Sequence, residues 1–494
     1  MIKLYDTLTR KKEELPPPSR EASADAKALA DKTGGTAATK GKLRIFVCGP
    51  TTYDYPHIGN ARTFMIFDII VRYLRSRGVE IFYLQNITDI DDKVIVRAAQ
   101  ENADWKTVSR RFEKIYLNDM KKLGITSVNK YARATDYIPQ IVSQVKRLVE
   151  KGNAYLIEND GYYFDLKTFP DYGKLAGRTV EQAEDATSRI DTSDKKRNKG
   201  DFALWKFSGP NEPGWKTELG FGRPGWHIED TAISEHFFGP QYELHGGALD
   251  LKFPHHEAEI AQAESISGKK PFVQIWMHAG FLFVNGKKMS KSLGNFITID
   301  EFVGHNSAEL FRWMVLNHHY RSPIDYTAEL LAQSKSSLGK LHQFVEKIKI
   351  VGKNQRRSFG STDPDLRRDD KAVDMHKRLS AAQAEFQNAM DDDVNTPGAV
   401  ASLFSLALEF QTKLWQLAPE DAKMLALYIE STLESLGISL KSPKIPKEIK
   451  ALVKKREAAR SNQQFMQSDD LRKEADSLGF IVEDTPMGPF VWPK

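Results

Sequence analysis

The order of predicted elements between residues 43 and 84 constrains the fold more than any other feature of the sequence. Leu43–Val47 and residues 79–84 are short apolar runs with β-branched or aromatic members, as in buried strands. Residues 61–77, between them, repeat apolar side chains at helical spacing, and a loop with Gly49 and residues 57–60 precedes this helix. Such an order opens a doubly wound, Rossmann-type α/β nucleotide-binding domain, although a βαβ unit without a nucleotide shares it.

Length and composition narrow the class of protein. A chain of 494 residues is long enough for about three domains, and 40% hydrophobic with 28% charged residues is ordinary for a soluble protein. The net charge of +5 permits a nucleic-acid partner without requiring one. Cys48 is the single cysteine, so no intrachain disulfide can form. No apolar run is long enough to span a bilayer, and the N-terminus lacks a signal pattern. We therefore expect a cytoplasmic protein with no membrane contact.

Two short motifs far apart in the chain carry candidate phosphate chemistry. Residues 285–292 read N-G-K-K-M-S-K-S, a tight-turn dipeptide followed by Lys288 and Lys291. Two ammonium groups on such a loop suit a polyphosphate whose charge moves during a reaction. The upstream motif is His57-Ile-Gly-Asn60. Each motif alone is weak, because a basic loop is usually only a solvated surface and four-letter patterns recur by chance.

A third group of residues has the donor types of a metal site. His255 and Glu259 are separated by four positions, so both side chains would reach one point from one face of a helix. Cys48 would supply a thiolate from a strand end, and zinc accepts sulfur, imidazole and carboxylate ligands. Cys48 could instead be a small buried hydrophobic residue.

These motifs together resemble one family. Residues 57–60 and 285–292 are similar to the H-I-G-H and K-M-S-K-S motifs of class I aminoacyl-tRNA synthetases. The stretches 46–51, Gly225-Trp-His-Ile-Glu-Asp230 and Phe253-Pro-His-His-Glu-Ala-Glu259 resemble the zinc-site motifs of the cysteinyl-tRNA synthetases. Residues 86–92, 392–397 and 479–484 also resemble stretches of that family, so the resemblance covers nearly the whole chain apart from about 16–42.

The resemblance implies an activity with defined partners. It implies a cysteine–tRNA ligase that activates L-cysteine with ATP to cysteinyl-adenylate and transfers it to the 3′-terminal adenosine of tRNA(Cys). The implied cofactors are one Zn²⁺ per chain and Mg²⁺ with ATP, and we expect a monomer. A bound zinc ion would coordinate the substrate thiol. Positioning and charge stabilisation would suffice for both steps, so no side-chain nucleophile is needed.

The resemblance also implies roles for individual residues. Catalytic roles fall to His57, Asn60, Lys288 and Lys291. The ATP-binding residues would be His57, Gly59, Asn60, Gly246, Gly247, Asp250 and Lys291. The amino-acid pocket would contain Thr88, Trp226, His245 and His278. The metal ligands would be Cys48, Asp230, His255 and Glu259.

Three of these positions depart from the family pattern. Asn60 replaces a histidine and can donate a hydrogen bond, but not as a cation. Ala248 replaces the third glycine of the stretch His245-Gly-Gly-Ala-Leu-Asp250. Asp230 replaces a cysteine, which hardens the site and weakens its retention of zinc.

For several residues, an interpretation without the implied functional role remains open. Asp250 could be a helix N-cap rather than a ribose contact. Trp226 and His278 could be core residues. Asp230 could be a surface carboxylate, or it could mark a site that has lost zinc.

The resemblance and the composition together predict six segments. These are a first half of the Rossmann catalytic domain at 1–130 with a flexible insertion at 16–42, an inserted connective domain at 131–224, the second half of the catalytic domain at 225–297, a stem-contact helical region and linker at 298–371, a helical bundle at 372–440, and a small anticodon-binding domain at 441–494. Residues 154–157 and 161–165 should form a hairpin in the inserted domain.

Three other functions compete with this interpretation. A tRNA-independent ligase that joins cysteine to an amino sugar resembles the same catalytic core, but it has no use for the helical segment from 372 or the basic tail. A catalytically inactive tRNA-binding module would not need His57, Lys288 and Lys291. A small-molecule nucleotidyltransferase of the superfamily would normally be much shorter.

The lysine loop yields a direct prediction. Because Lys291 should act on charge that develops in the transition state, Lys291→Ala should slow adenylate formation far more than it weakens cysteine binding. The loss of one such contact is worth about 2.7–4 kcal/mol, by analogy with an oxyanion-hole donor. Single-turnover adenylate formation measures the effect, and an unchanged rate would refute the role of Lys291.

Overall fold

The computed structural model describes residues 1–18, 41–178, 182, 193–290, 293–353 and 374–494. Lys291 and most of the segments predicted as an insertion and a linker lie outside these ranges. The chain forms two compact units, residues 1–330 with 389–396, and residues 331–388 with 397–494.

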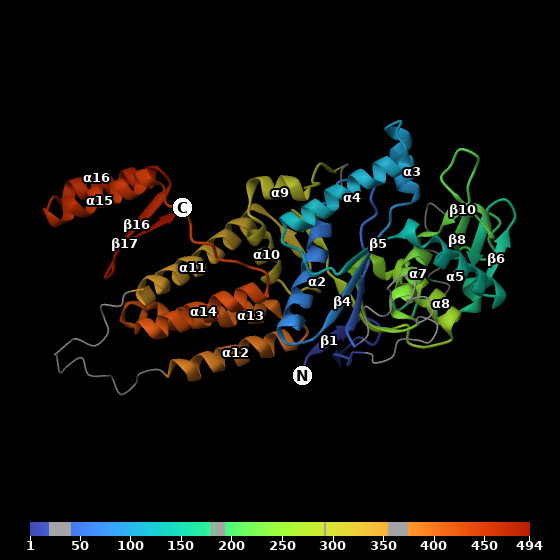
Figure 1. The fold of residues 1–494 in the computed structure, drawn as a ribbon, viewed down its shortest axis with the longest axis horizontal. Helices are drawn as coiled ribbons and strands as arrows, with labels where there is room; N and C mark the ends of the chain where they lie inside the picture. The colour runs from blue at the N-terminus through green and yellow to red at the C-terminus, as the bar shows by residue number, and fades with distance from the viewer. Residues whose placement is uncertain (19–40, 179–181, 183–192, 291–292, 354–373) are drawn as a thin grey trace. The chain divides into compact units, whose positions relative to one another are not determined.

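A parallel five-stranded sheet forms the centre of the first unit. Its strand order is β12-β11-β3-β4-β5, with β3 Leu43–Val47, β4 Ile81–Ile87, β5 Lys130–Arg133, β11 Tyr242–Ala248 and β12 Val273–Ala279. Helix α2 (Ile58–Ser76) connects β3 to β4 (Figure 1). The strand order reverses between β3 and β11, and such a switch point is where doubly wound sheets bind ligands. The prediction of a Rossmann-type α/β domain is confirmed.

Helix α2 begins earlier than the sequence predicts. The prediction of a loop at 57–60 is wrong, because Ile58 to Asn60 form the first turn of α2. His57 is the N-cap, and its Nδ1 accepts the backbone N–H groups of Gly59 at 3.1 Å and Asn60 at 3.3 Å. The Asn60 side chain accepts the His57 backbone N–H in return, at 3.4 Å. The motif is therefore a capping box in which imidazole replaces the usual hydroxyl or carboxylate.

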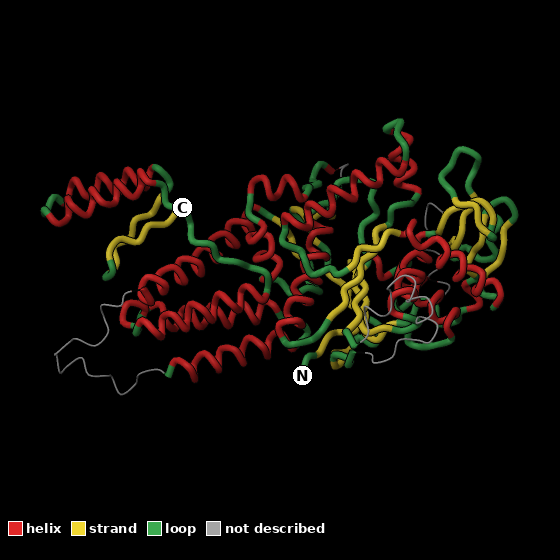
Figure 2. Tube along the Cα trace, viewed as in Figure 1, coloured by secondary structure: helices red, strands yellow, loops and turns green. Residues whose placement is uncertain are grey.

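The region between the two halves of the parallel sheet carries an antiparallel sheet of its own. Its order is β6-β7-β8-β10-β9, with β6 Ala154–Ile157, β7 Gly161–Phe164, β8 Phe202–Phe207, β9 Trp215–Thr217 and β10 Gly220–Pro224. The predicted hairpin is confirmed as β6 and β7. Figure 2 shows these strands apart from the strands of the parallel sheet, with helices between the two groups.

Helices surround the parallel sheet. Those before the antiparallel sheet are α3 Asp92–Gln100, α4 Trp105–Lys122 and α5 Ile138–Glu150. Those after it are α7 Trp226–Phe238 and α8 His255–Ser267, which pack against each other. Single-turn 3₁₀ helices cover Ala134–Tyr137, Leu166–Thr168 and Leu249–Lys252.

A β-hairpin presents the lysine motif. Strands β13 (Leu282–Val284) and β14 (Lys287–Lys288) pair across Asn285 and Gly286, which both have positive φ, of 50° and 73°. This is the backbone that favours an Asn-Gly turn. Strand β15 (Ile324–Tyr326) pairs with β13 and interrupts the helical region predicted from 298, which contains α9 Ile299–His305 and α10 Ala308–Leu316.

The remaining elements are mostly helical. They are α11 Ala328–Lys353, α12 Met375–Asp391, α13 Thr396–Gln411, the 3₁₀ turn Leu414–Gln416, α14 Pro419–Ser435, α15 Lys447–Ser461, α16 Phe465–Ser477, β16 Phe480–Thr485 and β17 Gly488–Pro493. The N-terminal hairpin of β1 (Lys3–Asp6) and β2 (Lys11–Glu14) belongs to the first unit. Within the described ranges, every helix is too short or too polar to cross a bilayer.

A buried ion pair joins α2 to α10 in the first unit. The Asp68 carboxylate accepts from the Arg312 guanidinium at 2.7 Å, and both side chains are at most 1% exposed. Arg72 donates to the same carboxylate at 2.7 Å, and the backbone N–H groups of Thr126 and Ser127 donate at 3.0 Å. Burial alone would raise the pKa of Asp68, but the two guanidinium groups outweigh it and hold that pKa below its ordinary value.

Removal of the buried partner should therefore destabilise the first unit. We expect Arg312→Met to lower the free energy of unfolding by about 3–5 kcal/mol, because it leaves a buried charge without its main partner. Arg72→Met is the matched control, since the Arg72 side chain is 28% exposed and its loss should cost only about 1 kcal/mol. Denaturant titration of both variants gives the comparison. Equal losses would contradict the ranking.

Candidate active site and metal centre

A cavity of about 570 Å³ lies where β3 and β11 end. Its walls come from the loop after β3, the first turn of α2, α7, α8 and the residues after β14. The sequence-predicted residues that line it are Cys48, His57, Asn60, Thr88, Trp226, Asp230, Asp250 and His255. The topology thus brings together, at one edge of the sheet, motifs that are some 200 residues apart in the chain.

The four predicted metal ligands meet at one point of this site. Cys48 Sγ lies 3.3 Å from Asp230 Oδ2, and His255 Nε2 lies 3.1 Å from the same oxygen. His255 Nε2 also lies 3.2 Å from Glu259 Oε1, which is 3.8 Å from Cys48 Sγ. Cys48 follows β3, Asp230 lies on α7, and His255 and Glu259 lie one turn apart on α8. All four are buried, so Asp230 is not a surface carboxylate.

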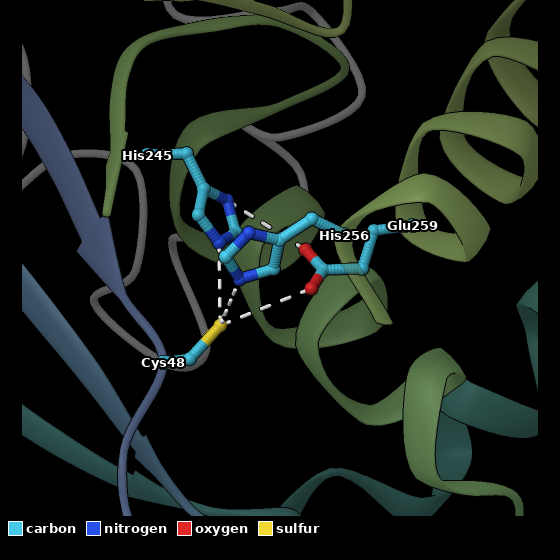
Figure 3. Close-up of side chains that lie close together, drawn as sticks. All are labelled: Cys48, His245, His256 and Glu259. Atoms are coloured by element: carbon cyan, nitrogen blue, oxygen red, sulfur yellow. Dashed lines mark hydrogen bonds and ion pairs between the residues drawn. The ribbon is translucent and has the colours of Figure 1, made fainter. Parts of the chain in front are cut away.

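A second donor set overlaps the first and was missed in part by the sequence analysis. Cys48 Sγ lies 3.1 Å from His256 Nε2 and 3.3 Å from His245 Nε2, so Cys48, His245, His256 and Glu259 also form a compact group. Figure 3 shows both imidazoles directed toward the sulfur. The sequence assigned His245 to the amino-acid pocket and gave His256 no role. The adjacent histidines at 255 and 256 were the available signal.

The chemistry of this cluster fits a divalent cation. Asp230 Oδ1 and Glu259 Oε2 are buried and have no hydrogen-bond partner in the described structure. Burial, followed by the charges of Glu259 and Asp230, raises the pKa of the Cys48 thiol, and burial and Asp230 raise the pKa of Glu259. Buried acidic groups are costly unless a cation compensates them. A thiolate, an imidazole and two carboxylates form a set that zinc accepts.

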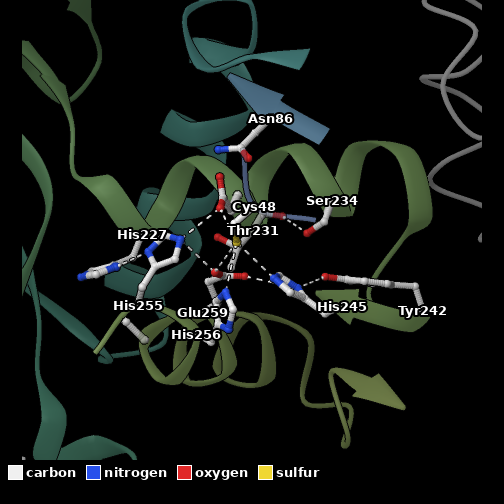
Figure 4. A network of polar contacts seen from close by, with 12 residues as sticks. Cys48, Asn86, His227, Thr231, Ser234, Tyr242, His245, His255, His256 and Glu259 are labelled. Carbon is white, nitrogen blue, oxygen red and sulfur yellow. Dashed lines mark hydrogen bonds and ion pairs between the residues drawn. The ribbon is translucent and has the colours of Figure 1, made fainter. Parts of the chain in front are cut away.

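Aromatic and imidazole rings surround the cluster (Figure 4). Trp226 stacks on His255 with ring centroids 4.2 Å apart, and it is 39% exposed and lines the cavity. His278 does not line the cavity. It is buried, with its Nε2 2.8 Å from His256 Nδ1 and its Nδ1 2.8 Å from Thr7 Oγ1. Its position supports the core interpretation rather than the predicted contact with the amino acid.

Among the residues predicted to contact ATP or its phosphates, Lys288 and Asp250 lie close to each other. Lys288 Nζ is 3.4 Å from Asp250 Oδ2, and both side chains are at least half exposed. Asp250 lies inside a 3₁₀ turn whose N-cap is Ala248, so the N-cap alternative for Asp250 is wrong.

Aromatic rings leave no room for a side chain at Gly246 or Gly247, whereas at Gly59 the nearest atom is the end of a flexible methionine side chain. A Cβ on Gly246 would lie 2.2 Å from the Phe67 ring, and one on Gly247 would lie 2.7 Å from the His256 ring. A Cβ on Gly59 would lie 2.7 Å from Met289. Their close neighbours in the structure are therefore protein side chains.

His57 is held in its neutral form. Burial and the Lys288 charge lower its pKa to about 4, against the opposing effects of Asp250 and Asp54. Because Nδ1 accepts two backbone N–H groups, the neutral ring carries its proton on Nε2. His57 can thus donate one neutral hydrogen bond into the cavity.

Comparison with known proteins defines the class. Residues 36–336 match the family described as tRNA synthetases class I (C) catalytic domain. The methionyl-tRNA synthetase of Mycobacterium tuberculosis, solved with methionyl-adenylate, shares the fold with a TM-score of 0.57 at 15% identity, covering 80% of this chain and 90% of its own. A putative arginyl-tRNA synthetase from Campylobacter jejuni gives a TM-score of 0.53 at 13% identity, covering 86% of this chain and 100% of its own. The fold is that of a class I aminoacyl-tRNA synthetase catalytic domain.

Relatives with higher sequence identity show which family within this class the chain belongs to. The cysteine–tRNA ligase of Thermococcus gammatolerans is 38% identical over 507 residues, covering 100% of this chain and 99% of its own. That of Clostridioides difficile is 39% identical over 490 residues and covers 99% of both chains. Residues 385–441 match the DALR domain, and residues 442–489 match the cysteinyl-tRNA ligase anticodon binding domain. The chain belongs to the cysteine–tRNA ligase family.

The lowered pKa of His57 predicts a pH dependence. The unfolded chain should bind the His57 proton near pH 6.5 and the folded chain only near pH 4, so this histidine should reduce stability progressively as the pH falls from 6.5 toward 4. His57→Asn keeps an acceptor for the helix cap without the titration. The difference in unfolding free energy between wild type and variant should therefore change across that window. An NMR titration of His57 with a midpoint near 6.5 would contradict the prediction.

Proposed function

We propose that this chain joins L-cysteine to the 3′-terminal adenosine of tRNA(Cys), at the cost of ATP, and recognises cysteine through a zinc ion. Cysteine–tRNA ligase activity follows from the family. The proposal adds one Zn²⁺ per chain, held by Cys48, Asp230, His255 and Glu259. The observation that carries it is the buried cluster of these side chains on a cavity that also contains His57 and borders Lys288.

The proposed reaction has two successive transfer steps. In the first, the cysteine carboxylate attacks the α-phosphate of Mg-ATP and pyrophosphate leaves. Lys288 and Lys291 stabilise the charge that shifts to the phosphates, while neutral His57 donates from Nε2. In the second, a ribose hydroxyl of the terminal adenosine attacks the activated carbonyl, and AMP leaves. The zinc ion, when bound, favours a thiolate and thereby distinguishes the substrate sulfur from the oxygen of serine.

The choice between the two overlapping donor sets follows from access. Cys48, Asp230 and His255 line the cavity, whereas His245 and His256 do not. An ion that takes the substrate thiol as a further ligand must be reachable from the cavity. The unpartnered oxygen of Asp230 also belongs to this set. His245 and His256 then pack against the site from within the protein.

The remaining assignments concern partners and domains. We assign the acceptor-stem contact to residues 298–371, the helical bundle to 372–440 and anticodon recognition to 441–494. We further assign the protein to the cytoplasm as a monomer. The tRNA-independent amino-sugar ligase is not supported, because the relatives that match the full chain are cysteine–tRNA ligases.

One assay tests the proposed function. Amino-acid-dependent pyrophosphate exchange is measured with each amino acid, and the metal content is measured on the same samples. We expect about one zinc per chain, exchange with cysteine, and rejection of serine. If metal-free protein activates cysteine normally and still rejects serine, the zinc mechanism is wrong for this chain.

Substitution of two ligands makes the metal prediction specific. Cys48→Ala should lose zinc and cysteine activation together, because it removes the one thiolate. Asp230→Ala should lower the zinc affinity, measured by competition with a chelator, by at least about 10- to 100-fold. That range is the loss expected for a residue that only hydrogen-bonds to a metal ligand. Asp230→Cys is the matched variant and should retain zinc as well as, or better than, wild type, since a thiolate is the softer ligand. A chelator titration in which the two Asp230 variants behave alike would remove Asp230 from the ligand set.

A further inference from the structure

The loop between β3 and α2 exposes an aromatic ring at the candidate active site. Tyr55 lines the cavity, and 48% of its surface is exposed. Its ring meets the buried ring of Phe112 on α4 edge to face, with centroids 5.4 Å apart. A large exposed aromatic side chain that is fixed by a buried one is available for stacking. The family motifs quoted above do not include Tyr55.

The backbone around Tyr55 is anchored on both sides. Thr52 donates its N–H to the Thr88 carbonyl at 3.1 Å, and its hydroxyl lies 2.6 Å from that of Ser109 on α4. The Pro56 carbonyl accepts the Ile299 N–H at 3.1 Å. Between these points, Tyr55 N–H donates to the Asp54 carboxylate at 2.9 Å. The ring is therefore held in place before a ligand binds, and this reduces the entropy lost on binding.

Two arginine side chains lie beside the Phe112 ring, and a lysine lines the same cavity as Tyr55. Lys93 is exposed, lines the cavity, and has its Nζ 5.4 Å from the Tyr53 ring. The Arg97 and Arg111 guanidinium groups lie 5.5 and 4.6 Å from the Phe112 ring, and both pair with Glu101. Exposed aromatic rings with neighbouring cations are the composition that binds single-stranded nucleic acid.

We propose that Tyr55 stacks with an unpaired base at the 3′ end of the tRNA, and that the Lys93 ammonium group forms an ion pair with the adjoining phosphate. The inference rests on the proposed function, in which a hydroxyl of the terminal nucleotide must reach the activated carboxyl group inside this cavity. The last nucleotides of the acceptor strand must therefore enter the cavity and pass the side chains that line it.

The position of Tyr55 favours this strand over the adenine of ATP. The candidate ATP residues that the structure describes lie at the N-cap and first turn of α2, on β11 and in the 3₁₀ turn Leu249–Lys252, whereas Tyr55 packs on α4. The Asp54 carboxylate beside the Tyr55 backbone disfavours a phosphate there and leaves the ring face for an uncharged base.

The test is a cycle between a protein change and an RNA change. Dissociation constants are measured at one salt concentration for full-length wild type, Tyr55→Ala and Tyr55→Phe, each with tRNA(Cys) that is intact or lacks its last two nucleotides. Tyr55→Ala should bind intact tRNA about 5- to 150-fold more weakly, the range for loss of a base–aromatic stack. The two losses should not add, so truncation should weaken the binding of Tyr55→Ala clearly less than it weakens the binding of wild type, with the residual loss coming from phosphate contacts such as that of Lys93.

Two variants control for folding and for surface aromaticity. Tyr55→Phe keeps the ring and should behave as wild type. Phe221→Ala removes a 37% exposed aromatic ring from β10 and should leave the effect of truncation intact.

Three outcomes overturn the inference. In the first, Tyr55→Ala weakens intact and truncated tRNA equally. In the second, it weakens neither. In the third, it raises the KM for ATP in cysteine-dependent pyrophosphate exchange and leaves the truncation effect unchanged, which would give the ring to ATP. If wild type charges tRNA(Cys) with cysteine in any of these cases, the proposed function stands and only the role of Tyr55 falls. If wild type charges no tRNA, the proposed function fails and the inference with it.

Discussion

The buried negative charge beside Cys48 is the constraint on which the rest of the site depends. Asp230 and Glu259 each have an oxygen without a hydrogen-bond partner in the described structure, and a thiol lies between them. Such a group is stable only as a protonated cluster or around a cation, since buried carboxylates are costly without compensation. The sheet and helices α7 and α8 impose this arrangement, because they place three separate segments at the switch point.

Relative to the cysteine that the family resemblance implies at position 230, the Asp230 carboxylate would change the hardness of the ligand set more than its charge. A thiolate and a carboxylate each contribute one negative charge, so the total charge around a dication is conserved. The carboxylate is a harder ligand and shifts the balance away from the metals that prefer sulfur. The neighbouring imidazoles of His245 and His256, at 3.3 and 3.1 Å from the sulfur, supply softer donors close by. An ion bound in the proposed site would therefore have imidazole rings near it as well as the carboxylate of residue 230.

Periodicity predicted the doubly wound sheet and the inserted hairpin, and the motifs shared with the family predicted the convergence of Cys48, Asp230, His255 and Glu259. These features succeed because they rest on local patterns that the topology of a parallel sheet brings together. Three features could not be predicted in this way. The His57 cap depends on which imidazole nitrogen faces the backbone. The role of His256 depends on the direction of one side chain on α8, and the exposure of Tyr55 depends on packing against α4, which lies more than 50 residues further along the chain.

The separation of the metal-site segments in sequence has a consequence for the newly made protein. Glu259 is 211 residues beyond Cys48, so a ribosome that adds about 5–20 residues per second needs about 10–40 s to supply the last donor after the first. Asp230 follows Cys48 by 182 residues, so for most of that interval the thiol has neither carboxylate neighbour and lacks the cover of α8. The Cys48 thiol of the nascent chain therefore lacks the cover of α8 through nearly half of the synthesis, and a metal ion held by all four proposed ligands could bind only after α8 has left the ribosome.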